Sequence, residues 1–464
     1  DEYGGSLENR IRFAKEALEA VRKTLGPNYP LMIRISRKLV IKETYEESDM
    51  LYFLDAVKDL IDIVNISAGM DCYGGDVDNY QANVYTHTTI FEPRFFNLMF
   101  AEKVKKEIGL KVCLVGGVNN PKYCDELIKN GKIDAVMLGR QLVADPYWPN
   151  KALNGQDEEI LPCLRCLNCY HIATEHANVQ CSVNPRFRRE NRVPLKLTKS
   201  ENPLRVVVVG GGPAGMKAAL TACEKGHHVI LLEKDNKLGG QLNYAEIGKY
   251  KEDIHLYKEY LINHVLKSDI DLKLNTSASK ELLEQLNPDR VILALGADYI
   301  YPKIDGVERA VQAVDALSKD LDKLSGKTVV IGGGTIGSEI ALDLAESGKN
   351  VSIVEMSDKL CSKGNKLYRI ALNHHIEKSE TLTIYLSSTV TKITDKGVYL
   401  NDKDGKEVFV EADNVILSIG LKPKSKEAAS LYLTGCQTRT IGDLKQVGTI
   451  IEATNDGYFA GDID

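Results

Sequence analysis

The first third of the chain alternates short apolar runs with longer stretches of helical period. Apolar runs at 31–36, 61–67, 112–117 and 135–140 are separated by stretches in which apolar residues recur every three or four positions. Strands that alternate with helices at this spacing predict a parallel α/β sheet. Glycine or polar residues close each apolar run, so these four βα units predict the C-terminal half of a (β/α)8 TIM barrel.

A second kind of pattern begins at residue 205. A β-branched run at 205–209 leads directly into Gly210-Gly-Gly212-Pro-Ala-Gly215, a helical stretch follows, and a further apolar run ends at Glu233. A glycine turn between strand and helix, answered by an acid about 20 residues on, is the specific form of the dinucleotide-binding fingerprint. The glycines would let the backbone approach a pyrophosphate, and Glu233 would bind ribose hydroxyls. A Rossmann-like fold without a ligand is the alternative.

The same pattern recurs from residue 328. A β-branched run at 328–331 precedes a turn containing Gly332, Gly334 and Gly337, and the next apolar run ends at Glu355. An acid at this position accepts a ribose 2′-hydroxyl and repels a 2′-phosphate. We therefore expect this unit to prefer a dinucleotide without a 2′-phosphate, which means NADH over NADPH if, as the resemblance described below implies, it binds the nicotinamide coenzyme.

Composition limits the function without specifying it. The chain has 464 residues, of which 43% are hydrophobic and 27% charged, as expected for about two to four ordinary globular domains. Its net charge of −6 offers no basic surplus for nucleic acid or an anionic membrane. We expect neither a membrane span nor a signal peptide, and a reducing, cytoplasmic location. Because the chain opens at Asp1 inside a motif, we also expect a preceding N-terminal part.

Four of the ten cysteines lie close together in the sequence. Cys163, Cys166, Cys169 and Cys181 form the pattern C-x2-C-x2-C-x11-C. Three thiolates at this spacing can hold three corners of a cubic cluster, and a fourth from a following turn can close it. Structural zinc usually takes two C-x2-C pairs set well apart, and disulfides belong to secreted proteins, so both alternatives fit less well. The spacing favours a 4Fe–4S cluster.

Several segments resemble a known family. Residues 1–13 (DEYGGSLENRIRF), 33–36 (IRIS), 115–118 (VGGV) and 138–146 (LGRQLVADP) are similar to the signature segments of Old Yellow Enzyme (NADH:flavin oxidoreductase) barrels. With the cysteine run behind them, they resemble the multidomain 2-enoate reductase and 2,4-dienoyl-CoA reductase branch. Bile-acid-modifying flavin reductases and trimethylamine dehydrogenase belong to the same branch.

The resemblance implies an FMN site at the carboxyl ends of the barrel strands. Arg34 would lie against the pyrimidine edge of the flavin and stabilise negative charge on the reduced ring. Gly116, Gly117, Gly139 and Arg140 would hold the phosphate, a role that their position at strand ends also allows. The alternatives are that the glycines only form turns and that Arg34 makes a salt bridge within the barrel.

The resemblance also extends the two dinucleotide units. The first would bind FAD, with help from Gly240 and Gln241 in a GGQL segment and from Asp443 in an Ile-Gly-Asp segment; the second would bind the nicotinamide coenzyme. The expected domains are a barrel half at 1–155, a cluster segment at 156–200, an FAD-binding domain at 201–315 and 440–464, and an NAD(H)-binding domain at 316–439.

Together these features predict an NADH-dependent iron–sulfur flavoprotein reductase. Electrons would pass from NADH to FAD, the cluster and FMN, and then to a small unsaturated carbonyl substrate. A hydride carries two electrons and a cluster passes one at a time, which explains a flavin on each side. We expect an ene-reductase that reduces the C=C bond of a 2-enoate. A 2,4-dienoyl-CoA reductase and a bile-acid or steroid enone reductase are alternative functions. An NADH oxidase or diaphorase, an amine dehydrogenase and an electron-transfer module are alternatives of other classes. The protein could also form a homo-oligomer.

The proton donor is the weakest part of the sequence argument. The resemblance implies a tyrosine upstream of the YGGS segment, and in the dienoyl-CoA branch a histidine after the sixth strand. The corresponding loop here, after residue 67, has no histidine at that place. Tyr73 and, later in the loop, His87 are the candidate donors.

Overall fold

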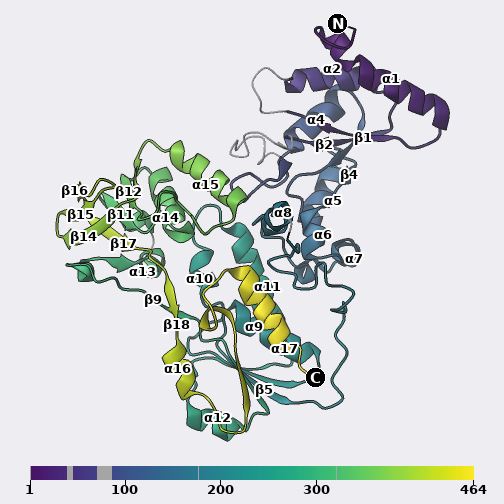
Figure 1. Ribbon diagram of the computed structural model, residues 1–464. Helices are drawn as coiled ribbons and strands as arrows, with labels where there is room; N and C mark the ends of the chain where they lie inside the picture. Colours follow the sequence, from purple (N-terminus) through teal and green to yellow (C-terminus); the bar gives the residue numbers. More distant parts are fainter. Residues whose placement is uncertain (1, 39–44, 70–85, 176, 320) are drawn as a thin grey trace. The chain divides into compact units, whose positions relative to one another are not determined.

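A computed structural model describes residues 2–38, 45–69, 86–175, 177–319 and 321–464. The chain divides into two compact units (Figure 1). The first unit comprises residues 1–142 and 146–157, and the second comprises residues 143–145 and 158–464. Each unit has its own hydrophobic core and is described by itself. No helix among these residues is both long and apolar enough to cross a membrane.

The first unit is built round a parallel sheet with the strand order β1-β2-β3-β4. Register pairs Arg34 with Asn65 and Asn65 with Cys113, so the carboxyl ends of the strands follow one another along one edge. This confirms the predicted series of βα units. The strands are β1 (Met32–Ser36), β2 (Ile63–Ser67), β3 (Lys111–Leu114) and β4 (Ala135–Val136), and the main helices are α1 (Leu7–Leu25), α2 (Glu47–Val57), α4 (Leu98–Glu107) and α5 (Pro121–Lys129).

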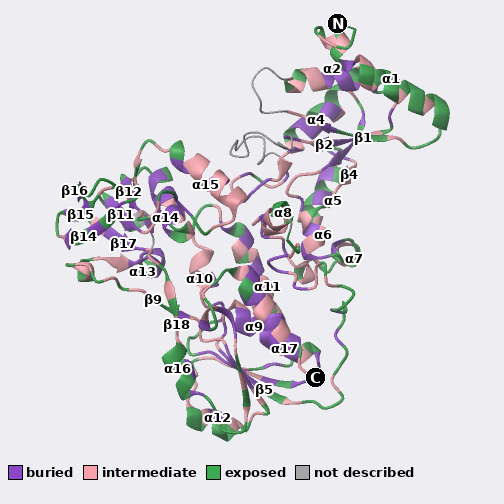
Figure 2. Ribbon diagram, viewed as in Figure 1, coloured by how far each residue is buried: buried purple, intermediate pink, exposed green. Residues whose placement is uncertain are grey.

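Local sequence explains where these helices begin. The hydroxyl of Ser6 accepts the backbone N–H of Asn9 at the start of α1. Asn120 caps α5 in the same way through Tyr123, and Pro121 occupies the first helical position, where no N–H is needed. The apolar faces of the helices then cover the sheet, whose central residues Val64 and Val112 are fully buried (Figure 2).

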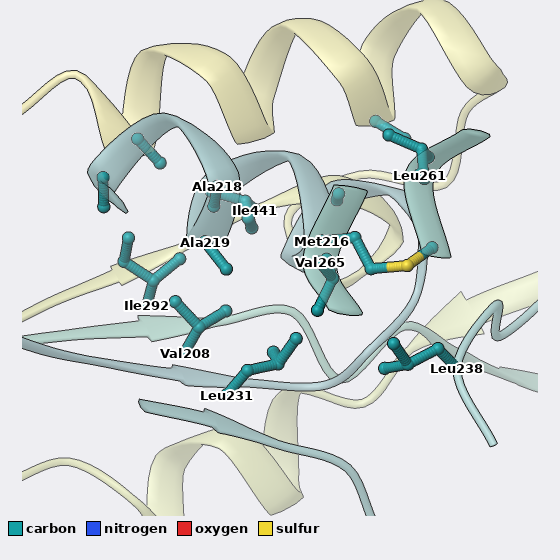
Figure 3. Close-up of a cluster of buried hydrophobic side chains, with 14 of the residues drawn as sticks. Val208, Met216, Ala218, Ala219, Leu231, Leu238, Leu261, Val265, Ile292 and Ile441 are labelled. Carbon is teal, nitrogen blue, oxygen red and sulfur yellow. The ribbon is translucent and has the colours of Figure 1, made fainter. Parts of the chain in front are cut away.

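The second unit begins with the cysteine segment and continues into a five-stranded parallel sheet in the order β19-β8-β5-β6-β7. Its interior is a layer of β-branched and small side chains between the sheet and two helices, α9 and α11 (Figure 3). Val208 and Ile292 lie on the sheet, Met216 and Ala219 on α9, and Val265 on α11 (Figure 3). The elements are β5 (Arg205–Val209), β6 (His228–Leu232), β7 (Asp271–Lys273), β8 (Arg290–Leu293), β19 (Gln437–Thr440), α9 (Pro213–Glu224), α11 (Glu252–Lys267) and α17 (Ile450–Gly461).

A second parallel sheet, ordered β10-β17-β11-β12-β13, is inserted before β19. The antiparallel pair β9 (Ala297–Tyr299) and β18 (Leu421–Pro423) takes the chain out to this sheet and back. A three-stranded antiparallel sheet, β14-β15-β16, adds to the insertion. Its elements are β10 (Val311–Gln312), β11 (Thr328–Ile331), β12 (Val351–Val354), β13 (Leu382–Tyr385), β14 (Thr389–Thr394), β15 (Gly397–Asn401), β16 (Glu407–Glu411), β17 (Asn414–Leu417), α14 (Thr335–Glu346) and α15 (Lys366–Glu377).

Two short strands belong to a different sheet from the one that the expected domain boundaries would give them. Strand β10 at 311–312 belongs to the inserted sheet, and β19 at 437–440 belongs to the first sheet. The physical reason is that the chain crosses between the sheets along the β9–β18 ladder. On the way out β10 pairs with β17 of the inserted sheet, and on the way back β19 pairs with β8 of the first sheet.

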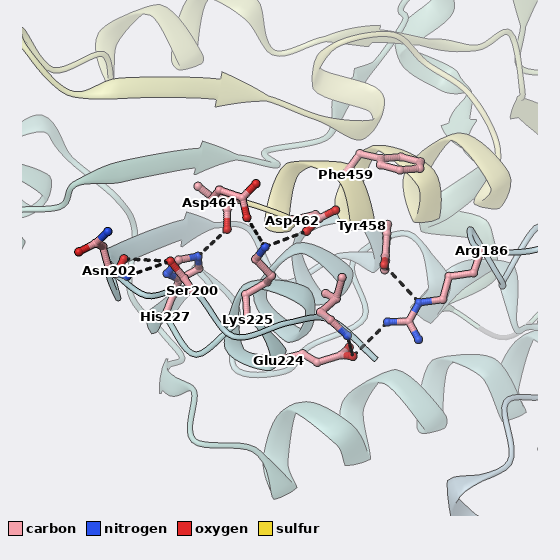
Figure 4. Close-up of polar contacts among 12 residues, drawn as sticks. Arg186, Ser200, Asn202, Glu224, Lys225, His227, Tyr458, Phe459, Asp462 and Asp464 are labelled. Carbon is pink, nitrogen blue, oxygen red and sulfur yellow. Dashed lines mark hydrogen bonds and ion pairs between the residues drawn. The ribbon is translucent and has the colours of Figure 1, made fainter. Parts of the chain in front are cut away.

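The C-terminal end is tied back to the first sheet by polar contacts (Figure 4). The Lys225 ammonium, at the end of α9, lies 2.5 Å from a carboxylate oxygen of Asp464 and 3.4 Å from one of Asp462. Arg186, just after the cysteine segment, donates to the hydroxyl of Tyr458 at 3.2 Å and to Glu224 at 3.0 Å. These contacts join the segment after the cysteines to helices α9 and α17.

Candidate functional site

The first glycine turn is shaped by its contacts with the sheet. Gly210 has a φ of +106°, and a Cβ at Gly215 would collide with the Gly210 carbonyl oxygen, so α9 can pack this closely only with glycine there. Gly212 caps the N-terminus of α9, and a Cβ built on it would meet nothing nearer than Gly240 Cα at 3.9 Å. The turn leaves open space at the helix N-terminus, where backbone N–H groups can receive phosphate.

Glu233 faces this turn from the end of β6. One of its carboxylate oxygens accepts the N–H of Gly211 at 2.6 Å, and the other accepts the N–H of Asp235 at 2.8 Å. The residue is buried. The acid is therefore held in one orientation beside the glycine turn, as the predicted ribose contact requires.

The second glycine turn repeats this geometry. A carboxylate oxygen of Glu355 accepts the N–H of Gly333 at 2.6 Å, and its other oxygen accepts both the N–H and the hydroxyl of Ser357, at 2.8 and 2.6 Å. A Cβ at Gly337 would collide with the Gly332 carbonyl oxygen. Gly334 has open space around it within 4 Å. The two turns place equivalent atoms in equivalent positions.

The remaining residues predicted for FAD gather at the first turn. Gly240 has a φ of +52° and lies against Gly212, where a Cβ would come within 2.9 Å of the Gly212 Cα. Gln241 accepts the Tyr299 hydroxyl at 3.0 Å. Asp443 accepts the N–H of Gly448 at 3.0 Å, and burial raises the pKa of its carboxyl group.

Two residues that contact the predicted cofactor residues, Tyr299 and Ser357, were not indicated by the sequence. Tyr299 comes from the crossover strand β9, 58 positions from Gln241. Ser357 lies two residues after Glu355. A serine this close in sequence to an acid can bond to it locally, and that spacing is the sequence signal that could have identified Ser357.

Three of the four cysteine thiols, those of Cys163, Cys166 and Cys181, lie near one another in the second unit. Burial, and then the neighbouring thiols of Cys163 and Cys166, raise the pKa of Cys181. The Cys166 sulfur lies 3.2 Å from the Ser182 hydroxyl oxygen. Cys169 lies in the first turn of α8 (Asn168–Thr174). None of these four cysteines is in a disulfide.

The arrangement of the thiols does not match the site of a single metal ion. Among the described residues, no group of three or more His, Cys, Asp or Glu side chains is arranged to hold one metal ion. A cubic cluster places its own irons and sulfides between the thiolates, so it needs a wider spacing than one ion does. The gathered thiols fit such a cluster, and the 4Fe–4S site stays a prediction.

Arg34 reaches the carboxyl edge of the first unit's sheet. Its guanidinium donates to the Ser67 hydroxyl at 2.9 Å and lies 3.9 Å from the Met137 sulfur. Ser67 is the last residue of β2 and Met137 follows β4, so Arg34 reaches the strand ends where the FMN site is expected, and its contact with the flavin stays a prediction. The alternative barrel salt bridge is not formed with any residue that the structure describes.

Arg140 has a side chain suited to binding an anion. One guanidinium nitrogen donates to the Thr88 hydroxyl at 3.1 Å, while the other terminal nitrogen is buried and has no hydrogen-bond partner among the described residues. A buried guanidinium nitrogen needs an acceptor, and a phosphate oxygen supplies one. Gly116 and Gly117 both have positive φ values, +122° and +70°, and Gly139 has no atom within 4 Å of its Cβ position. These features fit the predicted FMN phosphate site.

The two candidate proton donors differ in what can be said of them. Tyr73 lies outside the described residues. His87 is partly buried and immediately precedes Thr88, whose hydroxyl contacts Arg140. His87 therefore lies near the predicted phosphate arm, and its role as an acid stays a prediction.

Comparisons with known proteins match both halves of the chain. Residues 1–159 match the NADH:flavin oxidoreductase / NADH oxidase family, and residues 204–455 match the pyridine nucleotide-disulphide oxidoreductase family. The chain is 34% identical to an NADH oxidase from Thermoanaerobacter brockii, and the alignment covers 99% of the chain and 70% of that protein. It is 33% identical to a cinnamate reductase from Clostridium sporogenes, with the same coverage. A solved 2-naphthoyl-CoA reductase complex superimposes with a TM-score of 0.90 at 29% identity, over 99% of this chain and 69% of that one.

Proposed function

Because the chain belongs to the NADH:flavin oxidoreductase family, in its multidomain 2-enoate reductase branch, we propose that it reduces the C=C bond of a free 2-enoate with electrons from NADH. Family membership makes it an NADH-dependent flavoprotein reductase. The proposal adds the substrate class and the 4Fe–4S cluster. Its substrate is a small α,β-unsaturated carbonyl compound.

The observation that carries the proposal is the second glycine turn with its fixed acid. Glu355 is held by Gly333 and Ser357 in the orientation that a ribose 2′-hydroxyl needs. An amine dehydrogenase or a simple electron-transfer module sends electrons outward and has no need of such a coenzyme site. An intact site in the same chain as a flavin barrel favours a reductase.

When bound, NADH, FAD, the 4Fe–4S cluster and FMN would carry electrons in that order to the substrate. This chain's residues hold and orient those groups. Glu233 and Asp443 would bind the sugar hydroxyls of FAD, and Arg140 would bind the FMN phosphate. Arg34 would stabilise negative charge at the flavin's pyrimidine edge. Tyr73 or His87 would deliver the proton to the α-carbon.

The relatives support a free acid and keep one second candidate. The relative from Clostridium sporogenes is a cinnamate reductase, and cinnamate is a free 2-enoate. The solved relative was studied with 2-naphthoyl-CoA, a thioester. Reduction of a CoA thioester is therefore the second candidate function.

Anaerobic flavin absorbance separates these candidates. The full-length gene product is reduced with NADH, and cinnamate, an enoyl-CoA or oxygen is then added in separate cells. Reoxidation by cinnamate is the expected result, and hydrocinnamate, which lacks the C=C bond, is the matched control. Reoxidation by the thioester alone would replace the free acid with the second candidate. Reoxidation by oxygen alone would contradict both and favour an oxidase.

A further inference from the structure

A buried ion pair lies inside the cysteine loop. Arg165 stands between Cys163 and Cys166, and its Nε donates to an Asp253 carboxylate oxygen at 2.7 Å. The two side chains are only 7% and 1% exposed. Removing two charges from water costs several kcal/mol per ion by order of magnitude, and the attraction between them often does no more than offset this. Stability alone is therefore a weak explanation for the pair.

The helix that supplies Asp253 also packs into the hydrophobic core that contains Cys181. Tyr257 lies one turn after Asp253 on α11 and is fully buried. Burial, and to a smaller degree the Cys181 thiol, raise the pKa of Tyr257. Its hydroxyl lies 2.8 Å from the Thr454 hydroxyl of α17, in the part of the chain that follows Asp443. One face of α11 is thus joined to the cysteine loop by the bond from Arg165 to Asp253, and its Tyr257 lies in the same core as Cys181.

The loop conformation depends on buried side chains. Arg165 and Leu167 flank Cys166, and both are in the left-handed region, with φ values of +49° and +60°. A residue other than glycine in this region costs on the order of 1–3 kcal/mol and persists only where the surroundings impose it. Leu167 is buried in the core, and Arg165 is fixed by Asp253. These anchors turn the loop at each side of Cys166.

We propose that Arg165 and Asp253 are positioning residues of the 4Fe–4S site, which fix the turn of the cysteine loop and, by pairing opposite charges, prevent either charge from shifting the cluster's reduction potential. This inference rests on the cluster of the proposed function. Each electron that the cluster accepts, from NADH by way of FAD, adds one negative charge. A buried cation beside the loop favours that charge and a buried anion opposes it. In the native protein the two effects largely cancel.

The charges can be exposed one at a time with near-isosteric variants. Asp253→Asn leaves the guanidinium uncompensated, so the midpoint potential of the cluster rises. Arg165→Gln leaves the carboxylate uncompensated, so the potential falls. The double variant removes both charges and returns the potential close to the native value. A defect that merely loosened the loop would not move the two single variants in opposite directions.

The measurement is an anaerobic dithionite titration followed by electron paramagnetic resonance, with iron and acid-labile sulfide determined on each sample. Lys225→Gln is the control, because it removes a buried cation from an ion pair elsewhere in the second unit, although the carboxylate partners of Lys225 are more exposed than Asp253 (Figure 4). Its potential should equal the native one. Should Arg165→Gln lose its cluster, Arg165→Lys keeps the charge, and a native potential there with a raised one in Asp253→Asn still supports the inference.

Two results would overturn the inference and can be told apart. Loaded variants whose potentials are all native, or shift in the same direction, contradict it while leaving the cluster in place. A native protein without iron, sulfide or a cluster signal contradicts both this inference and the cluster of the proposed function.

Discussion

We expect Glu355 to determine the coenzyme preference through its two carboxylate oxygens. Both are oriented by Gly333 and Ser357. Replacing Glu355 with Ala should lower kcat/KM for NADH about 10- to 100-fold, because a hydrogen bond to a charged group contributes roughly 1.5–3 kcal/mol. The ratio of NADPH to NADH activity should rise, since the repulsion of a 2′-phosphate is lost. Stopped-flow reduction of bound flavin measures both.

The internal repeat supplies a control for that experiment. Glu233 has the same contact in the first turn, where Gly211 donates to it. Replacing Glu233 with Gln should lower FAD content and leave the NADPH-to-NADH ratio unchanged. If instead the Glu233 variant alters that ratio, the assignment of the two turns to FAD and NADH is reversed.

Arg140 allows the FMN phosphate site to be tested separately. Its buried nitrogen without a partner predicts an anion there. In the full-length protein, Arg140→Gln should weaken FMN binding at least about 10-fold, because a charge-assisted bond is lost, while FAD content stays the same. Lys111→Gln is the control, because Lys111 lies at the amino-terminal end of β3, whereas the predicted phosphate site lies at the carboxyl ends of the strands. Chromatography of the released flavins gives both contents, and an unchanged FMN content in the Arg140 variant would remove it from the site.

At the scale of elements, helix α15 is joined to the cysteine loop by its own cap. The side-chain oxygen of Asn365 accepts the N–H groups of Leu367 and Tyr368, and its nitrogen donates to the Cys166 carbonyl and to Asn168, both at 3.1 Å. Asn365→Asp keeps the cap and loses the donor, whereas Asn365→Ala loses both. Both variants should therefore loosen the loop, and Ala should cost about 1 kcal/mol more.

Thermal unfolding and the rate of cluster loss in air separate these two roles of Asn365. The two variants should lose the cluster at similar, faster rates, and the Ala variant should melt at the lower temperature. A native rate of cluster loss in the Asp variant would show that the bond to Cys166 contributes nothing to the loop.

Helix α14 brings a partly buried acid to the turn before α11. Asp343 packs against Gly248, near Lys251, and burial raises its pKa from 3.8 to about 6. Between these values the folded protein binds more protons than the unfolded chain, so stability falls as pH rises and stays low above pH 6. Asp343→Asn should therefore stabilise the protein above pH 6, by at most about 3 kcal/mol.

Melting curves at pH 5 and pH 7.5 test this assignment. The melting temperature of Asp343→Asn should exceed the native one at both pH values, by roughly half as much at pH 5 as at pH 7.5, because pH 5 lies about midway between the two pKa values. Asp358→Asn, at an exposed position, should match the native protein at both pH values. An equal gain at both pH values would mean that the charge of Asp343 is not the cause.

Elements were the level at which the sequence was most informative. Period and glycine position predicted β5, α9 and their repeat in β11 and α14, because those signals are local. The bond from Tyr299 to Gln241 and the ion pair from Arg165 to Asp253 span 58 and 88 positions. Such pairs arise only when the sheets assemble, so no local pattern announces them. Arg165 looked like an ordinary spacer between cysteines.

At the scale of the whole molecule, the two units differ in how complete their sheets are. The second unit has two five-stranded parallel sheets, each with its own glycine turn and acid. The first unit's four strands leave β1 and β4 as sheet edges among the described residues. A flavin in a (β/α)8 barrel is held by loops from the whole ring of strands. The FAD region and the FMN region should therefore differ in how well they retain their flavin when residues 1–464 are expressed by themselves.

Residues 1–464 alone should bind FAD and lose most of their FMN. The residues predicted to contact FAD all lie within the second unit, namely Gly212, Glu233, Gln241 and Asp443. Arg34 and Arg140 would contact FMN from only four strands, and an open parallel edge also exposes unpaired backbone groups. Flavin released from the purified protein should be FAD with little FMN, whereas the full-length gene product should release both. One FMN per chain from residues 1–464 would show that these four strands suffice, and the predicted eight-stranded pocket would then be wrong.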